Sequence, residues 1–290
     1  ITYDDEEGPR PAFEKFAKTN NISKLGVESR TIRHLELDLM NSTGIVSNIV
    51  DSIDIFSKLR MSKSDKEIDY MIEAVKIAET SLKSILGNIK PGVTEKQFAA
   101  DLVIELLQNG SDSELPFSPI VASGVNAANP HHFPGNKEFQ DGELIIIDWG
   151  ANFEGYFSDI TRTFALGDSI NSELLSAYET VRQANKSARI KADIGVQAGD
   201  VDQAARKVIE TSGFGKFFTH RTGHGLGLEI HEEPYIKPGN DFILEKGMTF
   251  TIEPGIYIPN LGGIRIEDDI HLEESGATSL TTLSRELICL

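Results

Sequence analysis

Two aspartates in this sequence flank a predicted β-turn. Asp148 and Asp159 lie on either side of Asn152-Phe153-Glu154-Gly155, whose residues favour a turn between strand-forming flanks. A turn centred on Phe153 and Glu154 would place the two aspartates opposite one another on a hairpin. Side chains paired in this way have Cβ atoms about 4.5 to 5.5 Å apart, and like charges at that distance destabilise a sheet.

The same arrangement recurs nearer the C-terminus. Glu253 and Glu267 flank Ile258-Pro259-Asn260-Leu261-Gly262-Gly263, and a turn centred on Asn260 would set the two glutamates face to face. A single acidic pair on a hairpin would usually be a solvated face. Here both pairs adjoin strongly apolar runs, so we expect them to be buried. Two buried pairs of like charge in one domain predict cations between the carboxylates.

A histidine between glycines completes the candidate site. His224 lies in Gly223-His224-Gly225-Leu226-Gly227, where glycine would let backbone and substrate approach closely. Carboxylates with one imidazole suit manganese, cobalt, iron or zinc, and paired metals about 3.5 to 4 Å apart can activate one water. The segment lacks the spacing of a dinucleotide or phosphate loop. The expected metal ligands are Asp148, Asp159, His224, Glu253 and Glu267; His220 is expected to be structural.

The charge balance argues against two classes of partner. The 290 residues include 45 Asp and Glu against 28 Lys and Arg, which gives a net charge of −17. Nucleic acid and anionic membranes both need a basic footprint, so we expect neither as a partner. No apolar stretch approaches the roughly 18 to 20 residues that span a bilayer. The start of the sequence is not a signal peptide, and Cys289 is the single cysteine, so we expect a cytoplasmic location.

The pattern of elements predicts two domains. Residues 1 to 60 contain short mixed elements that offer little for an independent core. Residues 61 to 290 open with two amphipathic helices separated by Pro91-Gly92, and continue with β-rich runs such as Leu144 to Ile147 and Met248 to Ile252. Helices and strands in separate runs indicate an α+β fold. The missing initiator methionine suggests that the chain begins inside a longer gene product.

Several motifs, in order along the chain, resemble the metal-dependent peptidases of pita-bread fold, which include methionine aminopeptidase, aminopeptidase P and prolidase. The resemblance covers roughly residues 60 to 290. The motifs are Asp148-Trp149-Gly150-Ala151, Ser158 to Phe164, Gly223 to Gly227 with His231-Glu232-Glu233-Pro234, Thr251 to Gly255, and Arg265 to Asp269. The resemblance implies a pita-bread catalytic domain over 61–290 and a remnant of an N-terminal α/β creatinase-like domain over 1–60. It also implies the same five metal ligands.

The resemblance also implies roles around the metals. Glu253 would help to activate the water, while His131 and His231 would contact the scissile amide and the tetrahedral intermediate. Of the adjacent histidines His131 and His132, His131 better matches the family position. Arg265 would orient the substrate or the ligand carboxylates, unless it only pairs with acids next to it in sequence.

Details of the motifs resemble the proline-specific branch of the family. This implies a two-metal enzyme, with manganese or cobalt ahead of zinc or iron, that cleaves the Xaa-Pro bond at the N-terminus of peptides or in dipeptides. Some prolidases place an arginine after His-Glu-x-Pro to bind a dipeptide's carboxylate, whereas this chain has Tyr235. This difference favours an aminopeptidase that acts on longer peptides. A methionine aminopeptidase-like enzyme, a non-catalytic binding module and a homodimer remain open.

Overall fold

The computed structural model describes residues 1 to 290. The chain divides into two units, Ile1–Arg60 and Met61–Leu290. The smaller unit combines three helices with two short parallel strands. Their bounds are α1 Arg10–Thr19, β1 Leu25–Val27, α2 His34–Ser42, β2 Ile49–Asp51 and α3 Ile53–Met61. Leu39 and Ile45 are its buried hydrophobic side chains, so its core is small.

Four long helices of the larger unit each follow a polar residue: Ser64, Thr94, Asn171 and Gln197. The helices are α4 Asp65–Ile85, α5 Glu95–Gln108, α6 Ser172–Lys191 and α7 Ala198–Thr211. The backbone N–H of Ser64, before α4, donates to Glu67 Oε2 at 2.8 Å. The hydroxyl of Thr94, before α5, accepts from the backbone N–H of Gln97 at 3.1 Å, which satisfies a first-turn donor. None of the helices has both the length and the apolar character that a bilayer crossing requires.

The strands of the larger unit form two main antiparallel sheets. One has the order β3-β4-β7, and the other has the order β14-β13-β10-β8-β9. Two separate two-stranded ladders lie within these sheets' hairpins: β5-β6 comes between β4 and β7 in the chain, and β11-β12 comes between β10 and β13. The bounds are β3 Ile120–Ser123, β4 Glu143–Trp149, β5 Asn152–Phe153, β6 Tyr156–Phe157, β7 Ile160–Leu166, β8 Gly223–Gly225, β9 Glu232–Ile236, β10 Thr249–Ile252, β11 Gly255–Ile258, β12 Gly262–Arg265, β13 Asp268–Glu273 and β14 Gly276–Ser279. Short 3-10 helices occupy Leu86–Asn88, Gly124–Ala128 and Gly215–Phe217.

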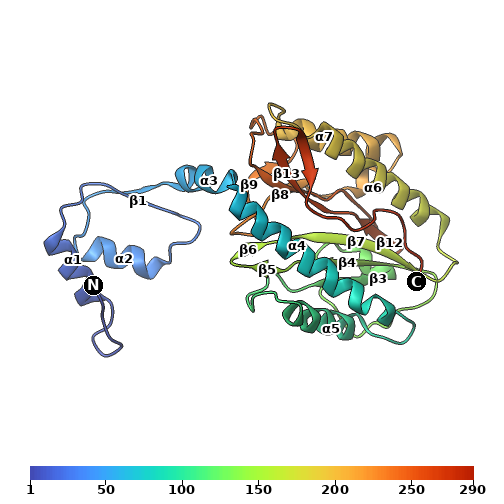
Figure 1. The fold of residues 1–290 in the computed structure, drawn as a ribbon, viewed down its shortest axis with the longest axis horizontal. Helices are drawn as coiled ribbons and strands as arrows, with labels where there is room; N and C mark the ends of the chain where they lie inside the picture. The colour runs from blue at the N-terminus through green and yellow to red at the C-terminus, as the bar shows by residue number, and fades with distance from the viewer. The chain divides into compact units, whose positions relative to one another are not determined.

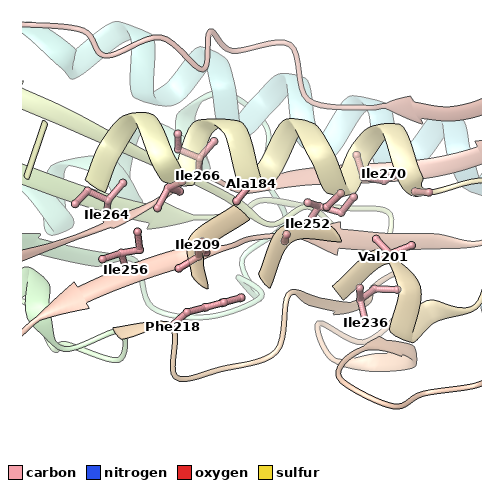
Figure 2. Packing of buried hydrophobic residues seen from close by; sticks show 14 of the residues in the cluster. Ala184, Val201, Ile209, Phe218, Ile236, Ile252, Ile256, Ile264, Ile266 and Ile270 are labelled. Atoms are coloured by element: carbon pink, nitrogen blue, oxygen red, sulfur yellow. The ribbon is translucent and has the colours of Figure 1, made fainter. Parts of the chain in front are cut away.

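Pairs of helices cover the sheets in two halves of the larger unit (Figure 1). Helices α4 and α5 share a core with β4 and β7, in which Phe98 and Trp149 are fully buried. Helices α6 and α7 share a second core with β9 to β13. Figure 2 shows Ile252 of β10 and Ile266, which lies between β12 and β13, beside Ala184 of α6. Burial of such side chains contributes about 1.5 to 3 kcal/mol each and holds the strand ends in place.

The first hairpin has a different register from the one that the sequence predicts. Strand β4 pairs with β7 so that Asp148 lies opposite Thr161, two residues beyond Asp159. The reason is the turn, because Glu154 (φ 53°) and Gly155 (φ 82°) both adopt left-handed backbone and together form its centre. Since strand side chains alternate between faces, a shift of two residues keeps Asp159 on the predicted face.

The second hairpin has the predicted register. Gly255 pairs with Arg265 in the β11-β12 ladder, and Ile252 pairs with Asp268 in the β10-β13 ladder. Both pairings belong to one register that continues across the interruption between the ladders. Glu253 and Glu267 stand in that interruption, opposite one another.

We predict that Ile209→Ala destabilises the larger unit by about 2 to 5 kcal/mol, because Ile209 of α7 is fully buried in the second core. Ile190→Ala, on neighbouring α6, is the matched control: Ile190 is 74% exposed, so we expect a change within about 0.5 kcal/mol. Urea unfolding followed by the fluorescence of Trp149, the single tryptophan, measures both. Equal effects of the two substitutions would contradict the described packing.

Candidate metal centre

The predicted site residues meet at one cavity of about 880 Å³ in the larger unit. Segments from both main sheets build its walls: the end of β4, the residue before β7, β8, and the interruption between the ladders of β10 to β13. The predicted residues that line it are His131, Asp148, Asp159, His224, His231, Glu253, Arg265 and Glu267. Distant parts of the sequence therefore converge as the motifs predict; the role of each residue stays a prediction.

Acidic side chains crowd one wall of this cavity. Ligand atoms of Asp159, His224 and Glu267 all lie within 4.8 Å of one another, and the three residues are buried. Burial raises the pKa of Asp159 and of Glu267 well above the usual range, and the charges of neighbouring carboxylates raise both further. Burial also raises the pKa of Glu253 to about 7. Without positive charge between them, these groups cannot all ionise near neutral pH.

His224 directs a lone pair at this acidic wall. Its Nδ1 lies 3.1 Å from the carbonyl oxygen of Gly225, which can only accept, so Nδ1 carries the proton. Burial lowers the pKa of His224 well below its usual value, so the ring is neutral. Its unprotonated Nε2 then lies 3.5 Å from Asp159 Oδ2 and 3.3 Å from Glu253 Oε1. Three lone-pair atoms facing one another form a site for a cation or a proton.

The donor set fits divalent metal ions. Asp148 Oδ1 is buried and has no hydrogen-bond partner, although its other oxygen is paired. A buried carboxylate oxygen without a donor is costly, and a cation satisfies it. Carboxylates together with one neutral imidazole suit hard to borderline divalent ions.

Arg265 pairs with Asp148 across the cavity and not with the acids next to it in sequence. Its Nη2 donates to Asp148 Oδ2 at 2.5 Å, and its Nε donates to the Thr161 hydroxyl at 3.1 Å. That hydroxyl donates in turn to Glu267 Oε2 at 2.5 Å. The Nη1 group donates to Tyr257 Oη at 2.8 Å. Arg265 thus fixes two expected ligands at once. Thr161 lies within a predicted motif but had no predicted role, and Tyr257 lies outside the motifs.

His220 belongs to the same hydrogen-bond network and also lines the cavity, and its structural role stays a prediction. Its Nδ1 lies 2.6 Å from the carbonyl oxygen of Arg221 and therefore donates. The other nitrogen, Nε2, accepts from Tyr257 Oη at 2.9 Å. Burial, and after it the charge of Arg265, lowers the pKa of His220 to about 3. The neutral ring orients the Tyr257 hydroxyl.

A buried carboxylate of α5 holds the loop that carries His131. Glu95 is fully buried, and its Oε1 accepts from the backbone N–H of Ser123 at 2.8 Å. Its Oε2 lies 2.8 Å from His132 Nε2 and accepts from the backbone N–H of Gly135 at 3.2 Å. Both adjacent histidines line the cavity, and His132 is the one whose ring is held by Glu95. The sequence offered no signal that linked Glu95 to this loop.

His231 stands beside His224 on a segment held by a buried ion pair. The two rings lie edge to face with centroids 4.3 Å apart. The neighbouring Glu232 accepts from Lys63 Nζ at 2.5 Å, and both side chains are almost fully buried. Removing one partner of such a pair leaves an uncompensated charge, so the pair fixes the backbone that presents His231.

Comparisons with known proteins agree with this geometry. The model of metallopeptidase family M24 matches residues 69–274. An Xaa-Pro dipeptidase of Pyrococcus furiosus is 38% identical, over 98% of this chain and 82% of its own. The crystal structure of a dipeptidase from Pyrococcus horikoshii OT3 has a TM-score of 0.94 at 43% identity, with 100% of this chain and 81% of that chain covered. An X-Pro aminopeptidase from Thermotoga maritima MSB8 has a TM-score of 0.91 at 34% identity, with 97% and 79% covered.

We predict that the metal-free protein loses stability as the pH rises from 7 to 9. The pKa of Glu253 in the folded state, about 7, lies above its usual value of 4.5, so its contribution is complete below about 4.5 and is mostly lost by pH 7. The pKa values of Asp159 and Glu267 are raised as well, and extend the loss to higher pH. The pKa values of His220 and His224 are lowered, so these two residues make stability rise with pH. They do so only below about pH 6.5.

Urea unfolding in EDTA at pH 7, 8 and 9 measures this loss. Excess Mn²⁺ should restore stability most at pH 9, because a cation that binds only the folded state replaces the missing protons. If the metal-free protein is as stable at pH 9 as at pH 7, other groups already compensate the negative charges of the acidic wall, and the prediction is wrong.

Proposed function

The chain belongs to metallopeptidase family M24, and from this premise we propose that it is a two-metal exopeptidase that hydrolyses the Xaa-Pro bond at the N-terminus of peptides or in dipeptides. The expected α+β pita-bread fold is confirmed by the family match and the solved relatives. One observation carries the proposal: buried carboxylates and the lone pair of a neutral imidazole face one another in a single large cavity.

The proposed metal ligands are the five predicted residues. Asp148, Asp159, His224, Glu253 and Glu267 would hold two divalent cations, with manganese or cobalt ahead of zinc or iron. When bound, such a pair lowers the pKa of a shared water toward neutrality and polarises the scissile carbonyl. Arg265 keeps Asp148 and, through Thr161, Glu267 in place for this role.

The chain's own side chains carry the proton and orient the substrate. Glu253 accepts a proton from the attacking water, a role that its position on the cavity wall supports. His231 stabilises the developing oxyanion and His131 contacts the scissile amide; both line the cavity, and His231 lies against His224. Burial lowers the pKa of His231, so a neutral ring with one N–H serves as the donor.

The proline preference follows from the relatives. Matched proteins carry the names Xaa-Pro dipeptidase and X-Pro aminopeptidase. Nucleic acid is not proposed as a partner, because the composition of this chain is acidic. We propose short peptides with proline at the second position as substrates, and residues 1–60 as part of an N-terminal domain through which a homodimer would form. A cytoplasmic location stays a prediction.

A panel of three peptides tests the substrate class. With Mn²⁺ or Co²⁺ loaded, we expect hydrolysis of Ala-Pro and Gly-Pro-Ala to exceed that of Met-Ala-Ser by at least about 100-fold in kcat/KM, which corresponds to about 2.7 kcal/mol of transition-state binding. Measuring released amino acids gives the rates. Preference for Met-Ala-Ser would indicate a methionine aminopeptidase-like enzyme, and no hydrolysis of any peptide would favour a binding module.

Substitution of one ligand tests the metal assignment directly. Glu267→Gln should lower bound metal to about one ion or fewer per chain and reduce kcat by about 100-fold or more, because an amide is a poor ligand for divalent ions. Elemental analysis after gel filtration counts the metal. Glu274→Gln, at a side chain that is 82% exposed, is the control and should keep metal and activity. Full metal content and activity in Glu267→Gln would rule out the proposed centre.

A further inference from the structure

Arg221 is a cation in the cavity wall without an anionic partner. It lines the cavity beside His220 and His224, and its Nε is buried without a hydrogen-bond acceptor. Its guanidinium carbon lies 4.9 Å from the ring centroid of Tyr235. Arg265, the other arginine of the cavity, has its donors taken by Asp148, Thr161 and other groups. Arg221 therefore keeps its hydrogen-bonding capacity for something that the protein does not supply.

The positive charge of Arg221 acts on the cavity. Arg221 lines the same cavity as the acidic side chains of Asp159, Glu253 and Glu267. A planar guanidinium with free N–H groups is the side chain best suited to bind a carboxylate through two parallel hydrogen bonds.

A second cation lies at the same end of the β8-β9 ladder. Gly223 pairs with Ile236 there, and the backbone N–H of Thr222 donates to the Ile236 carbonyl at 2.9 Å. Arg221 precedes this pairing and Lys237 follows it, so both flank Tyr235, and both line the cavity. The cavity thus has an acidic wall, which includes Asp159, Glu253 and Glu267, and a basic end, formed by Arg221 and Lys237.

We propose that Arg221 binds the terminal carboxylate of a dipeptide substrate, with Lys237 contributing at the exposed rim and the Tyr235 ring supporting the guanidinium. This rests on the proposed function, since it names the part of an Xaa-Pro dipeptide that the basic end receives. It also changes the meaning of Tyr235. A tyrosine after His-Glu-Glu-Pro need not exclude dipeptides, because the cation can come from the residues that precede β8 and lie over the tyrosine ring.

The test compares Ala-Pro with its C-terminal amide, which lacks only the negative charge. In the metal-loaded protein we expect the unmodified chain to prefer Ala-Pro, and Arg221→Gln to raise KM for Ala-Pro about 10- to 100-fold with a much smaller change for the amide. Arg221→Lys should fall between the two, because it keeps the charge without the planar fork. Lys216→Gln removes a cation that also lies over an aromatic ring, that of Phe217, but lines no part of the cavity; its KM values should not change.

Binding without turnover gives an independent measurement. In EDTA, saturation-transfer NMR with Ala-Pro and its amide should show a preference for the carboxylate in the unmodified chain, and Arg221→Gln should abolish it. Equal losses on both ligands, or an unmodified chain that does not discriminate between them, would overturn the assignment of Arg221. If the loaded chain hydrolyses neither ligand but the binding preference depends on Arg221, the proposed function fails and the carboxylate site stands.

Discussion

The larger unit is organised around carboxylates that repel one another inside a low-dielectric cavity. Asp159 and Glu267 come from different segments, yet their oxygens and the His224 lone pair lie within 4.8 Å of one another. Such crowding is unfavourable by itself, so the fold must supply the energy that holds the groups in place. The two hydrophobic cores under α4-α5 and α6-α7 do this, because they fix the strands whose ends carry the acids.

A second layer of polar contacts supports the acidic wall from behind. Arg162 donates from Nη1 to the Glu267 carbonyl oxygen at 2.5 Å and from Nη2 to Asp268 Oδ1 at 2.8 Å. Although burial would raise the pKa of Asp268, Arg162 and Arg285 hold it below its usual range. Asp269 accepts from the backbone N–H of Asp159 at 3.1 Å. The residues that follow Glu267 therefore tie the first hairpin to the second.

The sequence predicted what depends on local patterns and missed what depends on distant contacts. The motif around Asn260 predicted the second register, because its turn is short and flanked by regular strands. The first register was misplaced by two residues, since Glu154 adopts a left-handed backbone that glutamate seldom takes. Glu95 and Tyr257 could not be found, because their partners lie far away in the chain and only the folded structure brings the groups together.

The protons on the acidic wall have a consequence for how the chain matures. Before any cation arrives, the raised pKa of Glu253 and of its neighbours lets protons occupy the site, so the chain can fold with its charges already neutralised. Incoming metal ions displace these protons, so metal uptake releases protons into solution. Assembly of the centre is thus an exchange reaction, whose direction depends on the acidity of the surroundings as well as on the supply of ions.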